Sequence, residues 1–269
     1  MTHTPPVALT IAGSDSGGGA GIQADLKTFA FHAVHGTSAL TCITAQNTQG
    51  VTRVDALPSE AVVAQIEAVV EDMDLQSLKT DMLLNRSIIT AVADYIRERL
   101  PSRVSCVIDP VMVSRAGAQL LSDDALSTLR QQLVPLATVL TPNRYEAQLL
   151  AGRSISTLED MQAAALAIYG LGPKAVLIKG GGFTNALQGV DLWYDGSEMV
   201  RLATRRVETR DTHGTGCTLS AAIAANLALG YSPREAARKA KDYITHALEH
   251  SLRIGQGQGP VGHFYPILD

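Results

Sequence analysis

Short runs of apolar residues alternate along this chain with longer segments in which apolar residues recur at helical spacing. Short apolar runs are typical of strands buried on both faces, and a repeat of three to four residues is typical of helices with one buried side. The runs predict strands at 7–12, 37–45, 78–82, 106–111, 138–141 and 174–179. The repeats predict helices that follow the glycine run at 17–21 and that begin near 59, 87, 123, 156, 218 and 232.

Local signals predict where some of these helices begin and end. The apolar face of the first helix extends to Ala33. Ser59 is expected to cap the helix that it opens. Ser156, with Glu159 three residues later, matches the capping-box pattern. The last long helix is predicted to start at Ser232, where a proline follows in the first helical position.

The alternation of strands and helices predicts an α/β fold with a mostly parallel sheet covered by helices on both faces. Two β-rich runs at 190–194 and 199–207 flank the turn pair at 195–196, which predicts a hairpin and so a small antiparallel edge. No linker or repeat interrupts the pattern, so we expect residues 1–269 to form a single domain. Ligands of such sheets bind beyond the carboxyl ends of the strands, which makes the residues after each strand the candidates for a site.

Composition and charge exclude several classes of protein. The chain is 46% apolar and 18% charged, with a net charge of −4 and no cluster of Lys and Arg, so we expect no nucleic-acid partner. Its three cysteines lie far apart without a C-x-x-C pair, which argues against a disulfide framework or a zinc site and favours a reducing compartment. Neither a signal peptide nor an apolar run of membrane-spanning length occurs, so we expect a cytoplasmic protein without a membrane partner.

The first glycine-rich loop matches the dinucleotide pattern G-x-G-x-x-A at residues 19–24, between a strand and a helix. A dinucleotide site also needs an acid about 20 residues on to hold the ribose. None occurs between Asp25 and Asp55, which weakens an assignment as an NAD-dependent oxidoreductase. Either the glycines only permit a tight turn, or their small size lets a flat ligand approach the backbone.

The second glycine-rich loop, at residues 211–217, precedes an apolar helix. Glycines there leave the first N–H groups of the helix uncovered, and the helix dipole favours an anion beside them. The chain contains neither a G-K pair nor the motifs H-R-D and D-F-G, which excludes P-loop and protein-kinase designs.

Cys217 lies in the first turn of this helix, where the dipole is expected to lower the pKa of a thiol. The alternative is a small buried residue on an alanine-rich helix.

Seven motifs occur in order along the chain, each after a predicted strand. They are A-G-S-D-S-G-G-G-A-G-I-Q-A-D-L-K-T-F at 12–29, A-Q-N-T at 45–48, K-T-D-M-L at 79–83, D-P-V-M at 109–112, T-P-N-x-x-E at 141–146, K-G-G at 179–181 and D-T-H-G-T-G-C at 211–217. Together they resemble the motifs of the phosphomethylpyrimidine kinase family in the ribokinase-like superfamily, and the resemblance runs almost from end to end. It implies a three-layer αβα ribokinase-like fold, usually a homodimer, with ATP and Mg²⁺ as cofactors. It also implies phosphorylation of 4-amino-5-hydroxymethyl-2-methylpyrimidine to the monophosphate and then to the diphosphate, in thiamine biosynthesis.

The resemblance also implies roles for individual residues. Gln46 would hydrogen-bond the aminopyrimidine edge, because a carboxamide both donates and accepts. The remaining pyrimidine-binding residues would be Asp25, Ala20, Gly21 and Met82. The catalytic residues would be Cys217, Gly214, Thr215, Gly216 and Lys179, with residues 214–217 as the anion hole and Lys179 at the ATP phosphates. The residues for ATP and Mg²⁺ would be Asp109, Asn143, Glu146 and Lys241, with Asp109 and Glu146 holding the metal through water.

Three departures from the family pattern affect the expected site. Typical members read K-I-G-M-L in the motif where this chain has Asp81, K-S-G where it has Arg115, and K-G-G-H where it has Gly182. Asp81 adds a charge near the pyrimidine, and Gly182 removes a phosphate donor. Two alternatives remain besides the oxidoreductase: a pyridoxal kinase of the same superfamily, and a ligand-binding regulator that has lost activity, against which the intact motif at 211–217 argues.

Overall fold

A nine-stranded sheet forms the centre of the molecule in the computed structural model, which describes residues 4–112 and 121–268. The strand order is β3-β2-β1-β4-β5-β6-β7-β8-β9. Neighbouring strands from β2 to β7 are parallel, and the pairs β2–β3, β7–β8 and β8–β9 are antiparallel. The sheet is therefore mostly parallel, as predicted, but it has an antiparallel edge on each side.

The strands and helices follow one another in regular alternation. The strands are β1 (Val7–Asp15), β2 (His35–Asn47), β3 (Gly50–Ala56), β4 (Leu75–Thr80), β5 (Ser105–Ile108), β6 (Val139–Leu140), β7 (Val176–Ile178), β8 (Asp191–Tyr194) and β9 (Met199–Leu202). The helices are α1 (Gly21–Phe31), α2 (Ser59–Val70), α3 (Arg86–Glu98), α4 (Asp123–Thr128), α5 (Arg144–Ala151), α6 (Leu158–Tyr169), α7 (Thr215–Ala228) and α8 (Pro233–Glu249).

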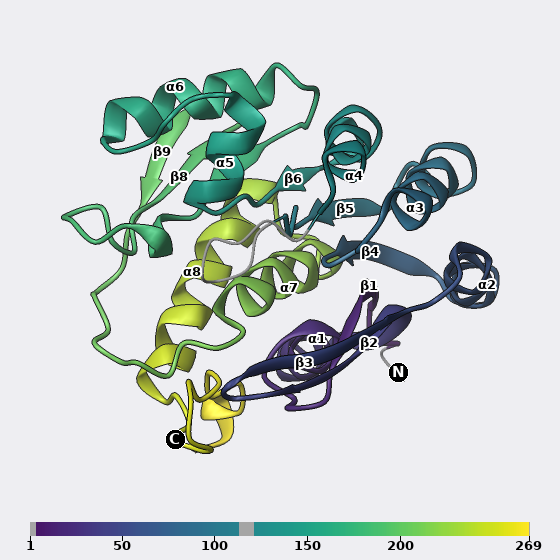
Figure 1. Ribbon diagram of the computed structural model, residues 1–269, viewed down its shortest axis with the longest axis horizontal. Coiled ribbons are helices and arrows are strands. Elements are labelled where there is room, and N and C mark those ends of the chain that lie inside the picture. The colour runs from purple at the N-terminus through teal and green to yellow at the C-terminus, as the bar shows by residue number, and fades with distance from the viewer. Residues whose placement is uncertain (1–3, 113–120, 269) are drawn as a thin grey trace.

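Helices cover both faces of the sheet, which gives the three layers that the resemblance implied. Helices α1, α7 and α8 pack together on one face, and α2 to α6 form an arc on the other (Figure 1). Because successive side chains of a strand point to opposite faces, β1 supplies Leu9 and Ile11 to one core cluster and Ala8 to the other. Alternation in the sequence thus builds two cores around one sheet.

Several predicted helix ends are wrong by one or two residues. Helix α1 ends at Phe31, and Ala33 has a left-handed φ of 55° beyond it. Ser59 lies inside α2 and makes no side-chain cap, since the helix begins after Pro58. The capping box of α6 is formed by Thr157 and its third helical residue, one position after the predicted pair. Ser232 is the N-cap of α8, as predicted, although its side chain makes no cap hydrogen bond.

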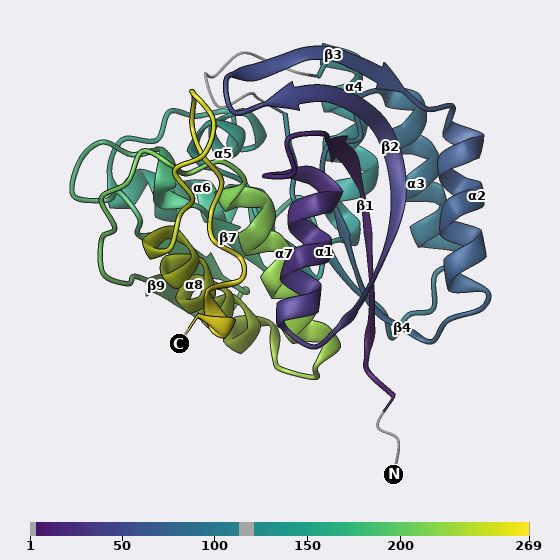
Figure 2. The same ribbon diagram turned by 90° about the horizontal axis from the view of Figure 1, so that it is seen from below.

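Two elements were not predicted from the sequence. Strand β3 is exposed along its whole length, so it lacks the apolar alternation by which strands are recognised. Helix α5 has eight residues and begins in the T-P-N-x-x-E motif. The segment after α8 returns to the β2–β3 turn, where the N–H of Gln258 donates to the carbonyl oxygen of Thr48 at 2.9 Å (Figure 2).

Candidate active site

The head of α7 lies at the carboxyl ends of the parallel strands. Gly214 is its N-cap with φ 79°, and a Cβ there would lie 1.8 Å from the carbonyl oxygen of Gly19. Only glycine fits, because of both the backbone conformation and this close approach. Within residues 4–112 and 121–268, no acceptor faces the N–H groups of Gly216 or Cys217. These donors and the helix dipole suit an anion, as the sequence predicted.

Lys179 brings a positive charge to the same place. Its ammonium lies 3.5 Å from where a Cβ on Gly216 would be, so it faces the first turn of α7. It also donates to Asp109 Oδ1 at 2.8 Å, while Ser220 donates to Asp109 Oδ2 at 3.0 Å. Lys179 and Asp109 are nearly buried. The end of β7, the end of β5 and α7 therefore meet in one charged cluster.

Glu146 adds a second buried carboxylate to this cluster. It forms a capping box with Asn143, since each side chain accepts from the other residue's N–H, at 2.8 and 3.0 Å. Burial and the repulsion of Asp109 raise the pKa of Glu146 to about 8, against the attraction of Lys179. Burial, partly offset by Lys179, likewise raises the pKa of Asp109. A cation bound next to these two carboxylates would offset their mutual repulsion and stabilise their ionised forms.

The first glycine-rich loop is closed by the carboxylate of Asp15. Asp15 Oδ1 accepts from the N–H of Gly17 at 2.8 Å, and Oδ2 accepts from the N–H groups of Gly19 and Ala20 at 3.1 and 2.8 Å. These donors are therefore not available to a pyrophosphate. A Cβ on Gly21 would lie 2.3 Å from the carbonyl oxygen of Gly13, so the glycine permits a tight turn. This arrangement gives the dinucleotide interpretation no support.

Gln46 and Met82 lie at the neighbouring strand ends with their side chains partly exposed. The methyl carbon of Met82 lies over Gly13, 2.9 Å from where a Cβ would be. The amide of Gln46 lies 3.3 Å from Thr44 Oγ1 and 3.4 Å from His213 Nε2. Both side chains therefore remain partly accessible at the strand ends.

Asp25 lies beneath the site and not in its lining. Its side chain is fully buried, and it accepts from Thr10 Oγ1 at 2.6 Å and from Lys79 Nζ at 2.7 and 2.8 Å. Lys79 also donates to Asp81 at 2.7 Å. Burial would raise the pKa of Asp81, but Lys79 and a hydrogen bond from Cys217 lower it below its ordinary value. The resemblance implied that Asp25 contacts the ligand. In the structure, Asp25 instead holds the ammonium of Lys79 in place.

The pKa of the Cys217 thiol is raised, not lowered as predicted. Burial is the main cause, and the negative charge of Asp81 is the next. Lys79 acts in the opposite direction but does not prevail. Cys217 is therefore a protonated thiol that donates to Asp81.

Lys241 does not reach the strand ends with a free ammonium. It donates to the carbonyl oxygen of Gly189 at 2.7 Å and pairs with Asp191 at 2.9 Å. Asp191 in turn accepts from the N–H of Gly180 at 2.8 Å. Lys241 thus supports the loop that follows Lys179. Arg115 lies outside the described residues.

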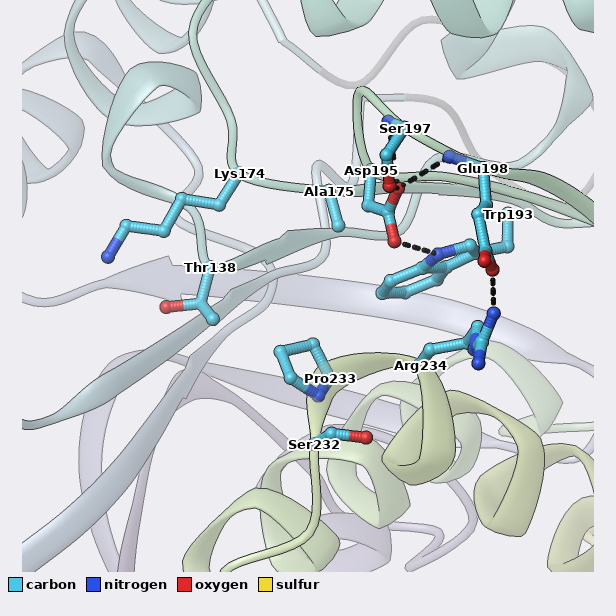
Figure 3. A pocket seen from close by; sticks show the side chains of 10 residues that line it. All are labelled: Thr138, Lys174, Ala175, Trp193, Asp195, Ser197, Glu198, Ser232, Pro233 and Arg234. Atoms are coloured by element: carbon cyan, nitrogen blue, oxygen red, sulfur yellow. Dashed lines mark hydrogen bonds and ion pairs between the residues drawn. The ribbon is translucent and has the colours of Figure 1, made fainter.

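Two surface cavities among the described residues lie elsewhere. One, of about 350 Å³, is lined by Trp193, by Lys174 and by the ion pair of Arg234 with Glu198 (Figure 3). The other, of about 590 Å³, is lined by residues such as Pro6 and Leu229. Lys174 precedes β7 and Pro6 precedes β1, so both cavities are at the amino ends of the parallel strands. Neither contains a residue predicted for the site.

Sequence reasoning missed several residues that organise this site. They are Asp15, Lys79, His213 and Ser220. Asp15, Lys79 and His213 lie within the seven motifs, so their position was a signal, but their partners are distant in sequence. Ser220 lies one helical turn beyond Gly216 and carried no sequence signal.

Comparisons with known proteins agree with this geometry. A family model described as phosphomethylpyrimidine kinase matches residues 15–262. The hydroxymethylpyrimidine/phosphomethylpyrimidine kinase of Synechococcus elongatus is 61% identical over 263 residues, which cover 98% of this chain and 99% of the relative.

Solved structures of related kinases share the fold. The ADP complex of Bacillus subtilis pyridoxal kinase matches with a TM-score of 0.90 and 40% identity, over 99% of this chain and 100% of that one. The phosphomethylpyrimidine kinase of Clostridium difficile matches with a TM-score of 0.80 and 41% identity, over 90% of this chain and 99% of that one. The fold of this chain is thus that of these small-molecule kinases. In the described residues, no helix is long and apolar enough to cross a membrane.

Proposed function

The chain belongs to the phosphomethylpyrimidine kinase family of the ribokinase-like superfamily, and on that premise we propose which role each residue of the site has in the reaction. It is an ATP-dependent kinase of thiamine biosynthesis. It phosphorylates 4-amino-5-hydroxymethyl-2-methylpyrimidine to the monophosphate and then to the diphosphate. The observation that carries the proposal is the ammonium of Lys179 facing the uncapped head of α7.

The head of α7 and Lys179 form the site for the transferred phosphoryl group. Phosphoryl transfer needs positioning and charge neutralisation more than covalent chemistry. The N–H groups of Gly216 and Cys217 and the ammonium of Lys179 supply that neutralisation without rearrangement, because Gly214 and Asp109 hold them in place. Lys241 contributes indirectly, through the loop after β7.

Asp109 and Glu146 fit a Mg²⁺ ion held through water. Mg²⁺ prefers oxygen ligands and keeps several waters, and these two carboxylates are buried at the same strand ends. Their raised pKa values support this assignment, because a cation beside them would stabilise the ionised carboxylates. The described residues contain no group of three His, Cys, Asp or Glu side chains that could bind a metal directly. When bound, the ion neutralises phosphate charge, while Asn143 holds Glu146 in place.

The pyrimidine ring is bound between Gln46 and Met82. The carboxamide of Gln46 pairs with the adjacent amino group and ring nitrogen, and Met82 packs on the ring. The backbone at Ala20 and Gly21 lies where α1 begins, beside the end of β1, and would contact the ring. Asp25 stabilises this region from below through Lys79.

Cys217 distinguishes the two phosphorylations. The first nucleophile is a hydroxyl group, which has a proton to lose, while the second is a phosphate oxygen that is already ionised. Because the Cys217 thiol is itself protonated, it takes up the hydroxyl proton only by passing its own proton to Asp81. Cys217→Ala is therefore expected to reduce kcat for the first step more than for the second. Equal losses in both steps would contradict a role of Cys217 in proton transfer.

A coupled ADP-release assay tests the function. Hydroxymethylpyrimidine, its monophosphate and pyridoxal are compared side by side at equal concentrations. We expect turnover with the first two and less with pyridoxal, which would limit the pyridoxal kinase alternative. No turnover with any of them would refute the kinase assignment.

The working form of the chain is a homodimer of single domains in the cytoplasm. One sheet joins elements from β3 to β9, which supports a single domain over residues 1–269. Strand β3 is exposed on both faces and, with β2, leaves Ile43, Val51 and Val54 about half exposed, which favours a second copy as partner. All three cysteines are free thiols, which fits a reducing compartment.

A further inference from the structure

His213 lies between the two glycine-rich loops and is held from several sides. Its N–H donates to the carbonyl oxygen of Gly259 at 3.0 Å, and its carbonyl oxygen accepts from Val261 at 3.2 Å. Its ring packs on Gly19, where a Cβ would lie 2.3 Å from the ring. The side chain is 14% exposed. The ring therefore has a fixed position at the edge of the pyrimidine site.

Asp15 determines which nitrogen of His213 carries a proton. His213 Nε2 lies 2.8 Å from Asp15 Oδ2. Burial would raise the pKa of Asp15, but hydrogen bonds from His213, Gly17 and Ala20 lower it below its ordinary value. An ionised carboxylate can only accept, so Nε2 of His213 must donate. The Nε2–H tautomer, or the doubly protonated ring, follows from this contact.

This proton in turn constrains the amide of Gln46. With Gln46 Nε2 at 3.4 Å from His213 Nε2, two donors would face each other. At the other end, Gln46 Oε1 lies 3.3 Å from Thr44 Oγ1, but the Thr44 hydroxyl donates its one proton to the carbonyl oxygen of Ser14 at 2.7 Å. Two acceptors would face each other there. Turning the carboxamide by 180° without moving the side chain removes both conflicts. Gln46 Nε2 then donates to Thr44 Oγ1, and Oε1 faces the Nε2–H of His213, whose proton stays in its shorter bond to Asp15.

We propose that Asp15 and His213 are positioning residues that fix the carboxamide of Gln46 with its oxygen toward His213 and its nitrogen toward Thr44. This inference rests on the proposed function and extends it to the orientation of the substrate. A 4-aminopyrimidine has a donor, the amino group, next to an acceptor, the ring nitrogen. The fixed carboxamide pairs with them in one sense only, with the amino group on the His213 side.

The orientation of the ring decides where the reacting group points. In 4-amino-5-hydroxymethylpyrimidine, the hydroxymethyl group is bonded to the carbon next to the one that carries the amino group, on the side away from the ring nitrogen. With the amino group toward His213, the hydroxymethyl group lies on the side of Gly214 and the head of α7. The reversed carboxamide would turn it away from the phosphoryl site. His213 thus links recognition of the ring to delivery of the hydroxyl group.

Nitrogen-15 NMR of the histidine side chains tests the tautomer without any turnover. The His213 resonances are assigned by their loss in His213→Gln, at neutral pH and without ligands. We expect Nε2 of His213 to be protonated. A His213 whose Nε2 is bare would overturn the proposal, whatever the kinase activity of the chain.

Kinetics of two variants test the consequence for binding. His213→Gln places an amide nitrogen the same number of bonds from the backbone, and His213→Met has similar bulk but no donor. We expect His213→Met to raise KM for hydroxymethylpyrimidine by about tenfold, because the carboxamide of Gln46 is no longer held in one orientation, with little change in KM for ATP. We expect His213→Gln to restore most of the affinity. Equal defects in the two variants would overturn the proposal, whereas a wild-type chain that phosphorylates neither pyrimidine would refute the proposed function and leave the NMR result standing.

Discussion

At the scale of single residues, the chemistry of this site depends on which neighbours share each charge. Cys217 illustrates this, because the helix dipole alone predicts a lowered thiol pKa, and burial beside Asp81 reverses it. Glu146 is a helix-capping residue by its contacts, yet burial and Asp109 make it an acid that resists ionisation. Neither property belongs to the residue type itself.

Asp81→Asn is expected to make Cys217 more reactive. Removing the negative charge leaves Lys79 as the strongest charge acting on the thiol, ahead of Asp25 and Asp109, so the pKa of the thiol should fall. If the pKa falls by about 1, the thiolate fraction and the rate of alkylation by iodoacetamide at neutral pH both rise about tenfold. Asp81→Asn with Cys217→Ser is the control, because it shows whether labelling occurs at Cys217. An unchanged rate would contradict the contact between Asp81 and the thiol.

Glu146→Gln is expected to change how stability depends on pH. The pKa of Glu146 is raised on folding from an ordinary 4.5 to about 8, so its stabilising contribution is present below the unfolded value and is lost as pH rises through the folded one. A tenfold difference in proton affinity between the folded and unfolded states corresponds to about 1.4 kcal/mol of stability. Glutamine also fits a capping box, so the helix start is kept.

Thermal unfolding measures this difference. Without Mg²⁺, Tm of the wild type should fall between acidic and mildly alkaline pH by more than Tm of Glu146→Gln. Addition of Mg²⁺ should raise Tm of the wild type most at alkaline pH and of the variant little. Parallel curves for the two proteins would contradict both the pKa of Glu146 and its place at the metal.

At the scale of elements, the start of α7 is determined by a close approach of two loops. Gly214→Ala would place a methyl group against the carbonyl oxygen of Gly19 in a left-handed conformation. We expect a loss of more than about 1 kcal/mol of stability and of most of kcat/KM, because the anion hole shifts. Gly230→Ala is the matched control at the other end of α7, since Gly230 has φ 88° and open space around it. Denaturant unfolding and steady-state kinetics measure both variants, and equal effects would refute the role of the loop contact.

At the scale of the whole molecule, the β2–β3 ribbon leaves apolar residues uncovered at one edge of the sheet. If a second copy covers them, sedimentation should give twice the chain mass of 28.5 kDa. Val51→Glu combined with Val54→Glu should shift the protein to monomers. Leu166→Glu, on an equally exposed residue of α6, should not. A monomeric wild type at micromolar concentration would contradict the homodimer.

The order of strands and helices was predictable because it depends on local periodicity. Runs such as 7–12 and 174–179 correspond to β1 and β7, since strands buried on both faces must be apolar throughout. Helix ends were predicted less well, because adjacent residues such as Ser156 and Thr157 compete for the same cap. Strand β3 was missed because it is solvent-exposed along its length.

The sequence by itself determined the family, the layers of the fold and the strand ends at which the site lies. Motifs and periodicity are local, so one chain is enough to read them. Only the tertiary structure decided which charges meet: Lys179 with Asp109, Lys79 with Asp25, and His213 with Asp15. These partners lie tens to hundreds of residues apart, and their protonation depends on burial and on each other, which no local pattern records. The head of α7 was visible in the sequence, and the state of Cys217 within it was not.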